Sequence, residues 1–339
     1  MRAVWLTEFG GPGVLVAGEA PDPVPGPGQV LVDVAYAGIT FVETQFRATG
    51  RGPFTAVPPV IPGNAVGGTV AAVGTGVDEA LLGRRVVTGT GGSGGYAEFA
   101  LAPAAGLIEV PEPLALDTAV ALLADGRTAL LELRAAGVVP GDRVLVEAAA
   151  GGVGTLLVQL ARAAGATVVA AAGGPAKTAL AAELGAHVTV DYRQPDWTDR
   201  VRETVGGLDV VLDGVGGAVA RAAFDLLAPG GRMVSYGLAS GEWAAIPSEL
   251  AAERGVALLQ PRPDPAAMRA LTTEALAEAA AGRLRPVIGL RLPLAAAAEA
   301  HAAIESRATT GKTLLEVGPE RRLRDRQVRK DFEPRGRAL

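Results

Sequence analysis

Cysteine is absent from this sequence of 339 residues, and histidine occurs only twice, as His187 and His301. Without cysteine the chain forms no disulfide bond, thiolate zinc site or iron–sulfur cluster, and it has no cysteine nucleophile. A catalytic zinc ion needs about three protein ligands. Two histidines that lie 114 residues apart supply these only together with an unusual carboxylate site. We therefore expect no metal site, and we expect both histidines to be structural.

Long apolar runs and a strong positive charge are also missing. Charged residues or glycines interrupt each apolar run before 18 residues, so no membrane span is predicted. The segment 1–11 contains Glu8 and lacks the apolar region of a signal peptide. The net charge of −5 gives no electrostatic reason to bind nucleic acid. We expect a cytoplasmic protein whose partners are neither a membrane nor nucleic acid.

The first third of the chain has the pattern of short β-strands. Positions 30, 32, 34 and 36 place three valines and a tyrosine on one face of a strand, after a segment rich in proline and glycine. Further short runs bounded by glycine lie at 68–74, 85–88 and 96–100. Many short strands with glycine turns are typical of a small barrel or sandwich.

From about residue 120 the pattern changes to strands that alternate with helices. The best-formed helix carries apolar residues at helical spacing from Val153 to Ala164. Six strands with crossover helices predict a doubly wound parallel sheet. The predicted strands are 143–148, 166–172, 187–192, 209–213, 232–236 and 256–260.

The last part of the chain does not continue this alternation. A helix at 265–281, a strand at 287–292, a helix at 294–306 and a strand at 312–317 are predicted to rejoin the first domain. The tail from residue 320 holds eight basic and four acidic residues. We expect a flexible, solvated end, and a functional basic arm is the alternative.

The strongest motif is the strand, glycine turn and amphipathic helix that begin at Val144. Gly151 and Gly152 allow the backbone to approach a pyrophosphate, and the helix N-terminus offers free N–H groups. Gly154 permits close packing of the helix on the strand. Ala149 replaces the usual first glycine, so the motif is a variant of the dinucleotide-binding fingerprint. A turn that serves packing alone is the alternative.

The end of the second strand of this unit predicts the choice of cofactor. An NAD site places an acidic residue near here to bind the ribose 2′-hydroxyl, but no acid occurs between Gly154 and Glu183. Small residues leave room for a 2′-phosphate, and Lys177 offers a positive charge. We therefore expect NADPH rather than NADH. A solvated helix charge is the alternative for Lys177.

Four segments together resemble a known superfamily: 148–154, 124–129, 213–217 and 306–312. They are similar to the medium-chain dehydrogenases/reductases and, within these, to the zinc-lacking NADPH:quinone oxidoreductases of the ζ-crystallin-like branch. The resemblance covers residues 1–317. It implies an α/β fold in which a GroES-like β-barrel catalytic domain carries an inserted Rossmann-type doubly wound parallel sheet domain.

The same resemblance implies the domain limits and the assembly. The catalytic domain would span 1–122 and be completed by 266–318, with the NADPH-binding domain at 123–265 and a basic tail at 319–339. The active site would lie in the cleft between the domains. A homodimer is also implied, and we expect it to form through the edge strand near 256–260 because exposed strand edges pair readily.

The resemblance implies cofactor contacts along the whole length of NADPH. The pyrophosphate, the adenosine ribose with its phosphate, and the nicotinamide half each have matching positions. These are Ala150, Gly151, Gly152, Val153 and Gly154 at the pyrophosphate; Gly173, Lys177, Tyr192 and Arg307 at the ribose and its 2′-phosphate; and Thr128, Gly217, Tyr236, Gly237, Leu238 and Ala239 along the nicotinamide half.

The substrate side departs from the family pattern. Asn64 stands where zinc-containing members have a histidine. Thr40 takes the place of a usual asparagine, and Gln45 lies near the position of an expected tyrosine. A second tyrosine is missing from 47–53. We expect a pocket of different shape, in which the Thr40 hydroxyl, a backbone N–H or the ribose hydroxyl stabilises a developing oxyanion.

The sequence thus predicts an enzyme that transfers a hydride from NADPH to a quinone, with no obligate acid. One alternative is an enoyl or alkenal reductase that acts on an enone, for example one of secondary metabolism, since only the pocket would differ. Another is an NADPH-binding protein without catalytic activity, with a sensing, RNA-binding or structural role.

Overall fold

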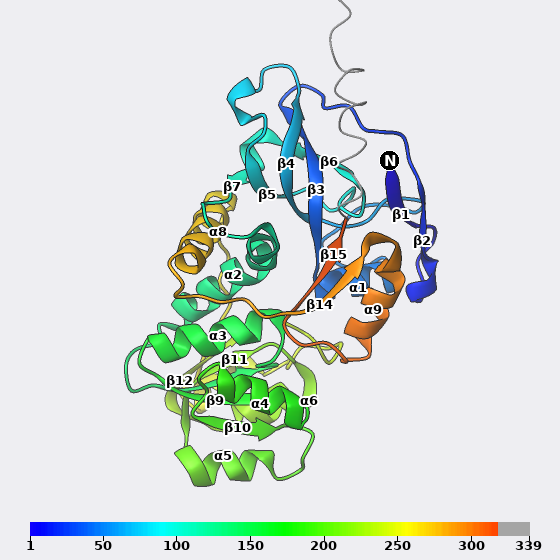
Figure 1. The fold of residues 1–339 in the computed structure, drawn as a ribbon. Helices are drawn as coiled ribbons and strands as arrows, with labels where there is room; N and C mark the ends of the chain where they lie inside the picture. The colour runs from blue at the N-terminus through cyan, green and yellow to red at the C-terminus, as the bar shows by residue number, and fades with distance from the viewer. Residues whose placement is uncertain (318–339) are drawn as a thin grey trace, which may run out of the picture.

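The computed structural model describes residues 1–317. Two large β-sheets occupy its two ends, and helices α2 (Leu116–Ala136) and α8 (Pro265–Ala280) pack on each other between them (Figure 1). The predicted tail at 319–339 lies outside the described residues. None of the helices in the described part of the chain has the length and apolar character of a membrane span.

The first sheet has seven strands and is antiparallel apart from its β14–β15 edge. The C-terminal strand β15 pairs with β3, so segments from the first and the last part of the described chain lie side by side in one sheet. Strands β1 (Arg2–Leu6) and β2 (Leu15–Glu19) form a separate hairpin beside it. In spatial order the strands are β14 (Ile288–Pro293), β15 (Lys312–Glu316), β3 (Gln29–Ile39), β4 (Ala65–Val73), β5 (Arg85–Gly89) and β7 (Ile108–Glu109), and β6 (Phe99–Pro103) pairs with β3.

The strand predicted at 96–100 is wrong in position, because β6 begins only at Phe99. The segment before it bonds to β1 instead. The Val4 N–H donates to the Tyr96 carbonyl at 2.9 Å, and the Glu98 N–H donates to the Arg2 carbonyl at 3.1 Å. The apolar pattern of these residues therefore reflects contact with the hairpin, which alternation alone does not distinguish from a strand of the main sheet.

The second sheet has six parallel strands in the order β10-β9-β8-β11-β12-β13. This order reverses between β8 and β11, which is the point where doubly wound sheets bind ligands. The six strands confirm the sequence prediction: β12 starts five residues earlier than expected, and each of the other five starts within one residue of its predicted position. They are β8 (Arg143–Glu147), β9 (Thr167–Ala172), β10 (Val188–Asp191), β11 (Leu208–Asp213), β12 (Leu227–Ser235) and β13 (Ala257–Leu259).

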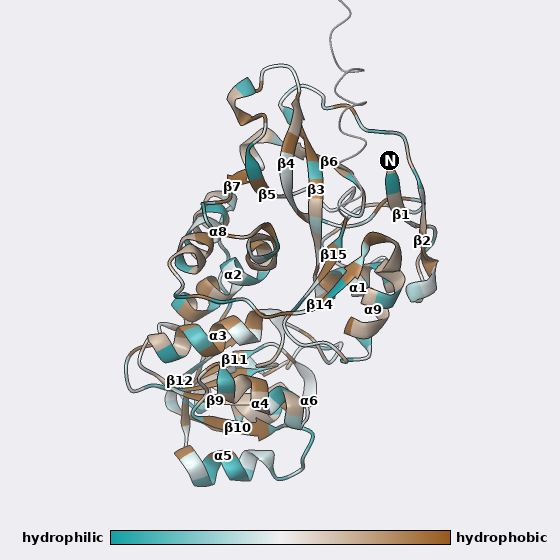
Figure 2. Cartoon of the chain, viewed as in Figure 1, coloured by the Kyte–Doolittle hydropathy of each residue, from teal (hydrophilic) through white to brown (hydrophobic). Residues whose placement is uncertain are grey.

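Both faces of this sheet are covered by helices. Alternate residues of each strand enter different cores: Val168 and Ala170 face α2, α3 and α4, whereas Val169 and Ala171 face the helices on the other side. The strands are hydrophobic along most of their length in Figure 2, as expected for a buried parallel sheet. The helices are α3 (Gly152–Ala163), α4 (Pro175–Glu183), α5 (Trp197–Val205), α6 (Gly217–Phe224) and α7 (Ser248–Glu253).

Helix α2 joins the two sheets. The hydrophobic core in which α2 packs contains Ala65 and Val87 from the first sheet together with Val144 and Val146 from the second. The predicted limit between residues 122 and 123 falls inside this helix, and the domain limits stay a prediction. On the far side of the first sheet, α1 (Phe41–Thr49) and α9 (Ala297–Glu305) lie side by side (Figure 1).

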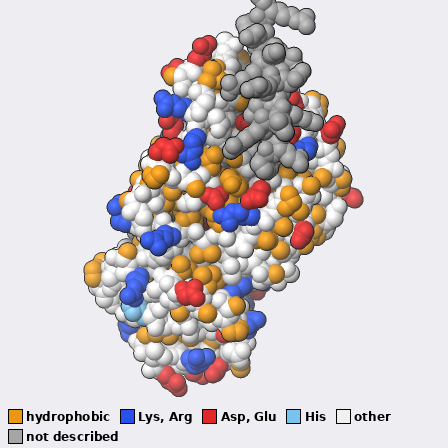
Figure 3. All heavy atoms as spheres, viewed as in Figure 1, with side chains coloured by type: hydrophobic (Ala, Val, Ile, Leu, Met, Phe, Trp, Pro, Cys, Tyr) orange, Lys and Arg blue, Asp and Glu red, His pale blue; other side chains and the backbone are white. Residues whose placement is uncertain are grey.

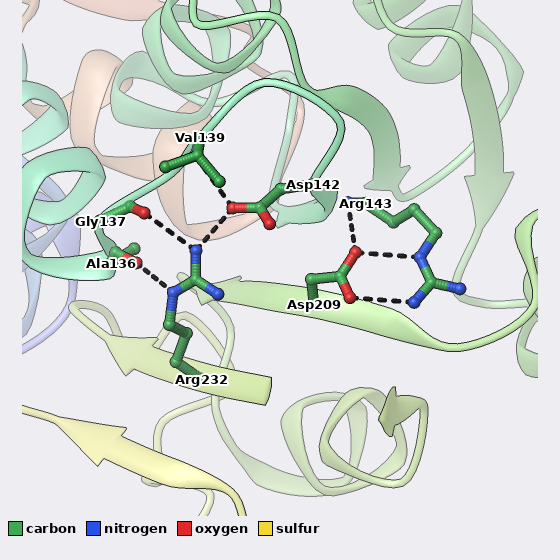
Figure 4. Close-up of polar contacts among 7 residues, drawn as sticks. All are labelled: Ala136, Gly137, Val139, Asp142, Arg143, Asp209 and Arg232. Atoms are coloured by element: carbon green, nitrogen blue, oxygen red, sulfur yellow. Dashed lines mark hydrogen bonds and ion pairs between the residues drawn. The ribbon is translucent and has the colours of Figure 1, made fainter. Parts of the chain in front are cut away.

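Ion pairs between arginine and aspartate residues link neighbouring segments at the amino ends of the parallel strands (Figure 4). Arg143 donates to both carboxylate oxygens of Asp209, each at 2.9 Å. Arg232 donates to Asp142 at 2.5 Å and to the Gly137 carbonyl at the end of α2 at 2.9 Å. Acidic and basic side chains are likewise interspersed over the face drawn in Figure 3.

Candidate active site

The turn between β8 and α3 lies at the carboxyl end of the sheet. Ala148 adopts a left-handed conformation with φ of 46°, and the Gly151 N–H donates to its carbonyl at 2.7 Å. No side chain caps the helix that starts at Gly152. The N–H groups of the first turn, from Gly152 to Gly154, therefore point out of the helix end without intrahelical acceptors, which suits an anion.

Two glycines of this turn have no room for a side chain. A Cβ on Gly152 would lie 2.0 Å from Oδ2 of Asp125 on α2, and a Cβ on Gly154 would lie 2.2 Å from the Ala148 carbonyl oxygen. The sequence predicts that Gly154 allows α3 to pack closely on the strand, and the short approach of Gly154 to the Ala148 carbonyl agrees with this prediction. Gly152 also packs against α2, a contact that the motif alone does not reveal. The bare backbone fits a dinucleotide pyrophosphate.

The C-terminal segment closes onto this turn. The Gly311 N–H donates to the Ala150 carbonyl at 2.7 Å, and Gly151 and Gly311 form an isolated β-bridge. The next residue, Lys312, forms a buried ion pair with Asp125, with Nζ 2.9 Å from Oδ1. Residues far apart in the chain thus meet behind the glycine turn, where both charges are shielded from water.

The residues predicted at the 2′-phosphate gather beyond β9. Lys177 Nζ donates to the Arg307 carbonyl at 2.7 Å, and Tyr192 lies against Gly173. The pKa of Lys177 lies below its ordinary value because of burial and of the neighbouring charges of Arg307 and Arg193. Neighbouring cations that repel one another favour binding of an anion between them.

Arg193 is a member of this cluster that the sequence reasoning missed. Its Nη2 atom lies only 2.4 Å from where a Cβ on Gly174 would be, and the same guanidinium pairs with Asp191 at 2.8 Å. Hydrogen bonds from Arg193 hold the pKa of Asp191 well below its ordinary range. The signal was present, because Arg193 directly follows Tyr192 in the sequence.

Arg307 reaches further than predicted. Its guanidinium donates to the Ala239 carbonyl and stacks on the Phe41 ring, with Cζ 4.3 Å from the ring centre. Its backbone has φ of 59°, and this left-handed conformation is energetically unfavourable for any residue other than glycine. Arg307 therefore connects the Lys177 cluster with the loop after β12 and with the start of α1.

The loops predicted along the nicotinamide half follow β11 and β12. Gly217 begins α6, and Gly237 approaches Gly214 so closely that a Cβ would lie 2.7 Å from the Gly214 carbonyl oxygen. The segment from Tyr236 to Ala239, including Leu238, therefore packs tightly on the loop after β11. Thr128 on α2 shares a helix face with Asp125 and Glu132.

Acidic side chains surround Tyr236. Burial raises its pKa well above the ordinary value, and Asp213, Glu147, Glu132 and Asp125 raise it further. Burial and the neighbouring Asp213 also raise the pKa of Glu147, and burial raises that of Glu132 to about 7. Within residues 1–317, Glu147 Oε1 and Glu132 Oε2 are buried without hydrogen-bond partners.

Thr40, which is predicted to line the substrate pocket, caps the N-terminus of α1. Its backbone N–H donates to Glu43 Oε2 at 2.6 Å, and its hydroxyl donates to the same oxygen at 2.8 Å. The Asn64 N–H donates to Glu43 Oε1 at 3.0 Å. Gln45, the other residue at a pocket position, is half-buried on α1. The structure thus reveals Glu43, buried behind Thr40, as a residue that the sequence reasoning missed.

Both histidines have structural contacts. Tyr96 and His301 form a buried hydrogen bond of 3.0 Å between Oη and Nε2, and His187 Nδ1 accepts from the Val168 N–H at 3.0 Å. The Asn64 side-chain oxygen accepts from the Gly92 N–H at 2.9 Å. In the part of the chain that the structure describes, histidine and carboxylate side chains form no group of three that suits a metal ion.

Comparison with known proteins identifies the family. The alcohol dehydrogenase GroES-like domain matches residues 26–112, and the zinc-binding dehydrogenase family matches residues 152–260. The human quinone oxidoreductase is 34% identical over 93% of this chain and 97% of its own length. The chain belongs to the quinone oxidoreductase family. A probable quinone oxidoreductase of Schizosaccharomyces pombe is 38% identical over 86% of this chain and 90% of its own length.

Solved structures of relatives agree with this family. The Escherichia coli quinone oxidoreductase complexed with NADPH has a TM-score of 0.86 at 29% identity, over 93% of this chain and 100% of that one. A mycobacterial protein complexed with NADPH has a TM-score of 0.84 at 36% identity, over 93% and 99%. A 2-haloacrylate reductase from Burkholderia is also similar, at 36% identity over 93% and 98%. The predicted family and the predicted GroES-like and Rossmann-type fold are confirmed.

Proposed function

We propose that this chain is a zinc-independent oxidoreductase that uses NADPH to reduce a quinone. The observation that carries the choice of cofactor is the cluster of Lys177, Arg193 and Arg307 beside Gly173 and Gly174, with Asp191 already paired to Arg193. A 2′-phosphate would relieve the repulsion in this cluster. Relatives that bear the name quinone oxidoreductase support the choice of substrate.

The same residues have distinct tasks in this proposal. The free N–H groups of Gly152, Val153 and Gly154, together with the backbone at Ala150 and Gly151, would hold the pyrophosphate. The loops after β11 and β12 would line the nicotinamide half, with Thr128 opposite. When bound, NADPH supplies a hydride to an electrophilic acceptor. The protein orients the acceptor and excludes water.

Zinc independence rests on the sequence. The chain has no cysteine, and Asn64 stands at the position where zinc-containing members have a histidine. The Asn64 side chain instead bonds to the Gly92 backbone. Elemental analysis of the purified, active protein should find less than one zinc ion per chain, and chelators should leave activity unchanged. Loss of activity on chelation, restored by zinc, would contradict this part of the proposal.

Oxidation of NADPH in the presence of different acceptors tests the reaction itself. Quinones, enals, 2-haloacrylates and enoyl thioesters form the acceptor set, and we expect the highest kcat/KM with a quinone. The similarity to 2-haloacrylate reductase favours an α,β-unsaturated carbonyl as the second candidate substrate. Binding of NADPH without turnover of any acceptor would rule out the enzyme proposal.

The cation cluster gives a prediction on affinity. Lys177→Ala should weaken NADPH binding about 10-fold, because a charge near the 2′-phosphate contributes about 1.4 kcal/mol or more, and it should change NADH binding little. Isothermal titration calorimetry with both cofactors measures this difference. Arg202→Ala, which removes an exposed charge on α5, is the matched control. An equal loss for NADPH and NADH would remove Lys177 from the phosphate site.

We also propose a cytoplasmic homodimer. The support for the dimer is β13, which is an edge strand of the parallel sheet and carries the exposed Leu258 beside the exposed Trp243. Pairing of two such edges would continue the sheet across the dimer. Analytical ultracentrifugation of wild type and Leu258→Glu tests this, with a dimer and a monomer as the expected results.

A further inference from the structure

Thr40 directly precedes a residue that lies where the two halves of the molecule meet. The next residue, Phe41, lies under the guanidinium of Arg307, and that guanidinium donates to the carbonyl of Ala239. Ala239 belongs to the loop after β12 that would line the nicotinamide half. These contacts connect the half-buried Thr40 to the reacting end of the proposed cofactor site.

The Thr40 hydroxyl already donates its single proton to a hydrogen bond within the protein. A hydroxyl has one hydrogen to donate and two lone pairs that accept, and in the structure the Thr40 hydroxyl donates to Glu43 Oε2 at 2.8 Å. While Glu43 is ionised, Thr40 cannot also donate to a substrate oxygen. When Glu43 is neutral, its own O–H can donate to Thr40, and the threonine proton becomes available.

Burial acts on the pKa of Glu43 against several neighbouring donors. Only 6% of the residue is exposed, and burial raises its pKa. The N–H and hydroxyl groups of Thr40, the ammonium of Lys312 and the N–H of Asn64 lower the pKa by a smaller amount, so that the net direction is upward. Tyr96 faces Glu43 from the segment before β6, with Arg47 and His301 beyond it.

Two other hydroxyl groups with raised pKa values are committed to other partners. Tyr96 is fully buried, and its hydroxyl bonds to His301 at 3.0 Å. The Tyr236 hydroxyl donates to the Glu147 carbonyl at 3.5 Å, on the side of the parallel sheet. Glu43 and Thr40 form the pair in which a buried acid stands directly behind a half-buried hydroxyl at the junction.

We propose that Glu43 supplies, through the Thr40 hydroxyl, the proton that the oxygen of the reduced substrate takes up. This inference rests on the proposed function, in which the cofactor provides the electron pair as hydride and leaves negative charge on that oxygen. The Thr40 O–H bond breaks as the substrate O–H bond forms, and the Glu43 O–H bond breaks as the Thr40 O–H bond is restored. The Glu43 carboxylate regains a proton from water through Thr40 after product release.

Three variants test the relay: Glu43→Gln, Thr40→Val and, as the matched control, Thr40→Ser. Quinone reduction is measured from about pH 5 to about pH 9, a range that includes the raised pKa of a buried carboxyl group. We expect kcat of the wild type to fall as Glu43 ionises. Glu43→Gln and Thr40→Val should lower kcat about 10- to 100-fold, the range of general acid catalysis, and should abolish this fall. Thr40→Ser, which retains a hydroxyl group, should retain the kcat of the wild type and its fall with rising pH.

Readouts without turnover separate this relay from a structural role. All three variants should bind NADPH with unchanged Kd. Infrared spectra of the protein without cofactor, labelled with ¹³C-glutamate, should show a carboxylic acid band near neutral pH that Glu43→Gln removes. If Glu43→Gln does not fold, the comparison of Thr40→Val with Thr40→Ser decides.

Two results would overturn the relay. One is a Glu43→Gln or Thr40→Val variant with the turnover and pH profile of the wild type, and the other is a Glu43 that is ionised throughout the pH range. These outcomes differ from failure of the proposed function, in which the wild type itself would reduce no quinone. In that case the infrared titration still decides whether Glu43 holds a proton behind Thr40.

Discussion

Acidic side chains are paired with cations at the amino ends of β8 and β11 and, within the described part of the chain, unpaired with cations at the carboxyl ends of these two strands. At the amino ends, Asp142 and Asp209 each bond to an arginine (Figure 4). At the carboxyl ends, Glu147 lies beside Asp213, and no cation pairs with it in residues 1–317. The amino ends are thus fastened by paired charges, whereas the carboxyl ends hold buried acids, glycine turns and unused N–H groups.

This difference separates structure from chemistry within one sheet. Paired charges at a partly exposed position stabilise the fold modestly and titrate outside the neutral range. Burial of an acid without a partner costs stability and raises the pKa of that acid. A protein retains such costly groups where a ligand or a reaction uses them, and the carboxyl end is where doubly wound sheets bind ligands.

Gly154→Ala should give the largest effect. Its Cβ would lie 2.2 Å from the Ala148 carbonyl oxygen, so that the turn must shift and the N–H groups that face the cofactor must move with it. We expect NADPH affinity to fall at least about 100-fold, since precise placement of donors is lost, and the melting temperature to fall as well.

Gly11→Ala is the matched control for this change. No atom lies within 4 Å of the position that its Cβ would take, and its backbone is extended. It should leave NADPH affinity and melting temperature unchanged. Calorimetric titration and thermal unfolding measure both quantities. A Gly154→Ala protein that binds NADPH normally would show that the carboxyl end tolerates changes as the amino end does.

Glu132→Gln should have an effect of intermediate size that depends on pH. Burial raises the pKa of Glu132 to about 7 from an ordinary value of 4.5. The folded protein therefore holds a proton that the unfolded chain has lost, and stability falls as pH rises from about 4.5 to about 7. At about 1.4 kcal/mol per pH unit, the loss is about 3 kcal/mol.

A variant without this carboxyl group should not lose stability in this way as the pH rises. Glu132→Gln should be more stable than the wild type above about pH 7 and of similar stability near pH 4. Urea unfolding at several pH values gives the two free energies of unfolding. Two curves that stay parallel from about pH 4 to about pH 8 would mean that Glu132 has the same pKa in the folded protein as in the unfolded chain.

Arg143→Met at the amino ends should have the smallest effect. The Arg143–Asp209 pair is about one-third exposed, so we expect a loss of about 1 kcal/mol in the free energy of unfolding and no change in NADPH affinity. The same titrations and unfolding curves apply. A marked loss of NADPH affinity would show that the two ends of the sheet are coupled.

The sequence predicted what depends on local pattern. Apolar periodicity defined the six strands of the parallel sheet, and the spacing of glycines predicted the turn at Gly151–Gly154. The strand at 96–100 was misplaced because β1, almost one hundred residues earlier, supplies its hydrogen-bond partners. Arg193 was missed although its neighbour Tyr192 was identified, because its role depends on its approach to Gly174.

By itself, then, the sequence determined the alternation of strands and helices and the position of the glycine turn after β8, since periodicity and glycine spacing are properties of neighbouring residues. Its resemblance to a known family supplied the GroES-like and Rossmann-type fold. The tertiary structure alone decided the contacts between distant residues: Lys312 with Asp125, and Arg307 with Ala239 and Phe41. It also decided the surroundings of Glu43, where burial raises the pKa. A carboxyl group keeps or loses its proton according to burial and neighbouring charges, and both depend on how α1, β15 and the Asn64 segment come together.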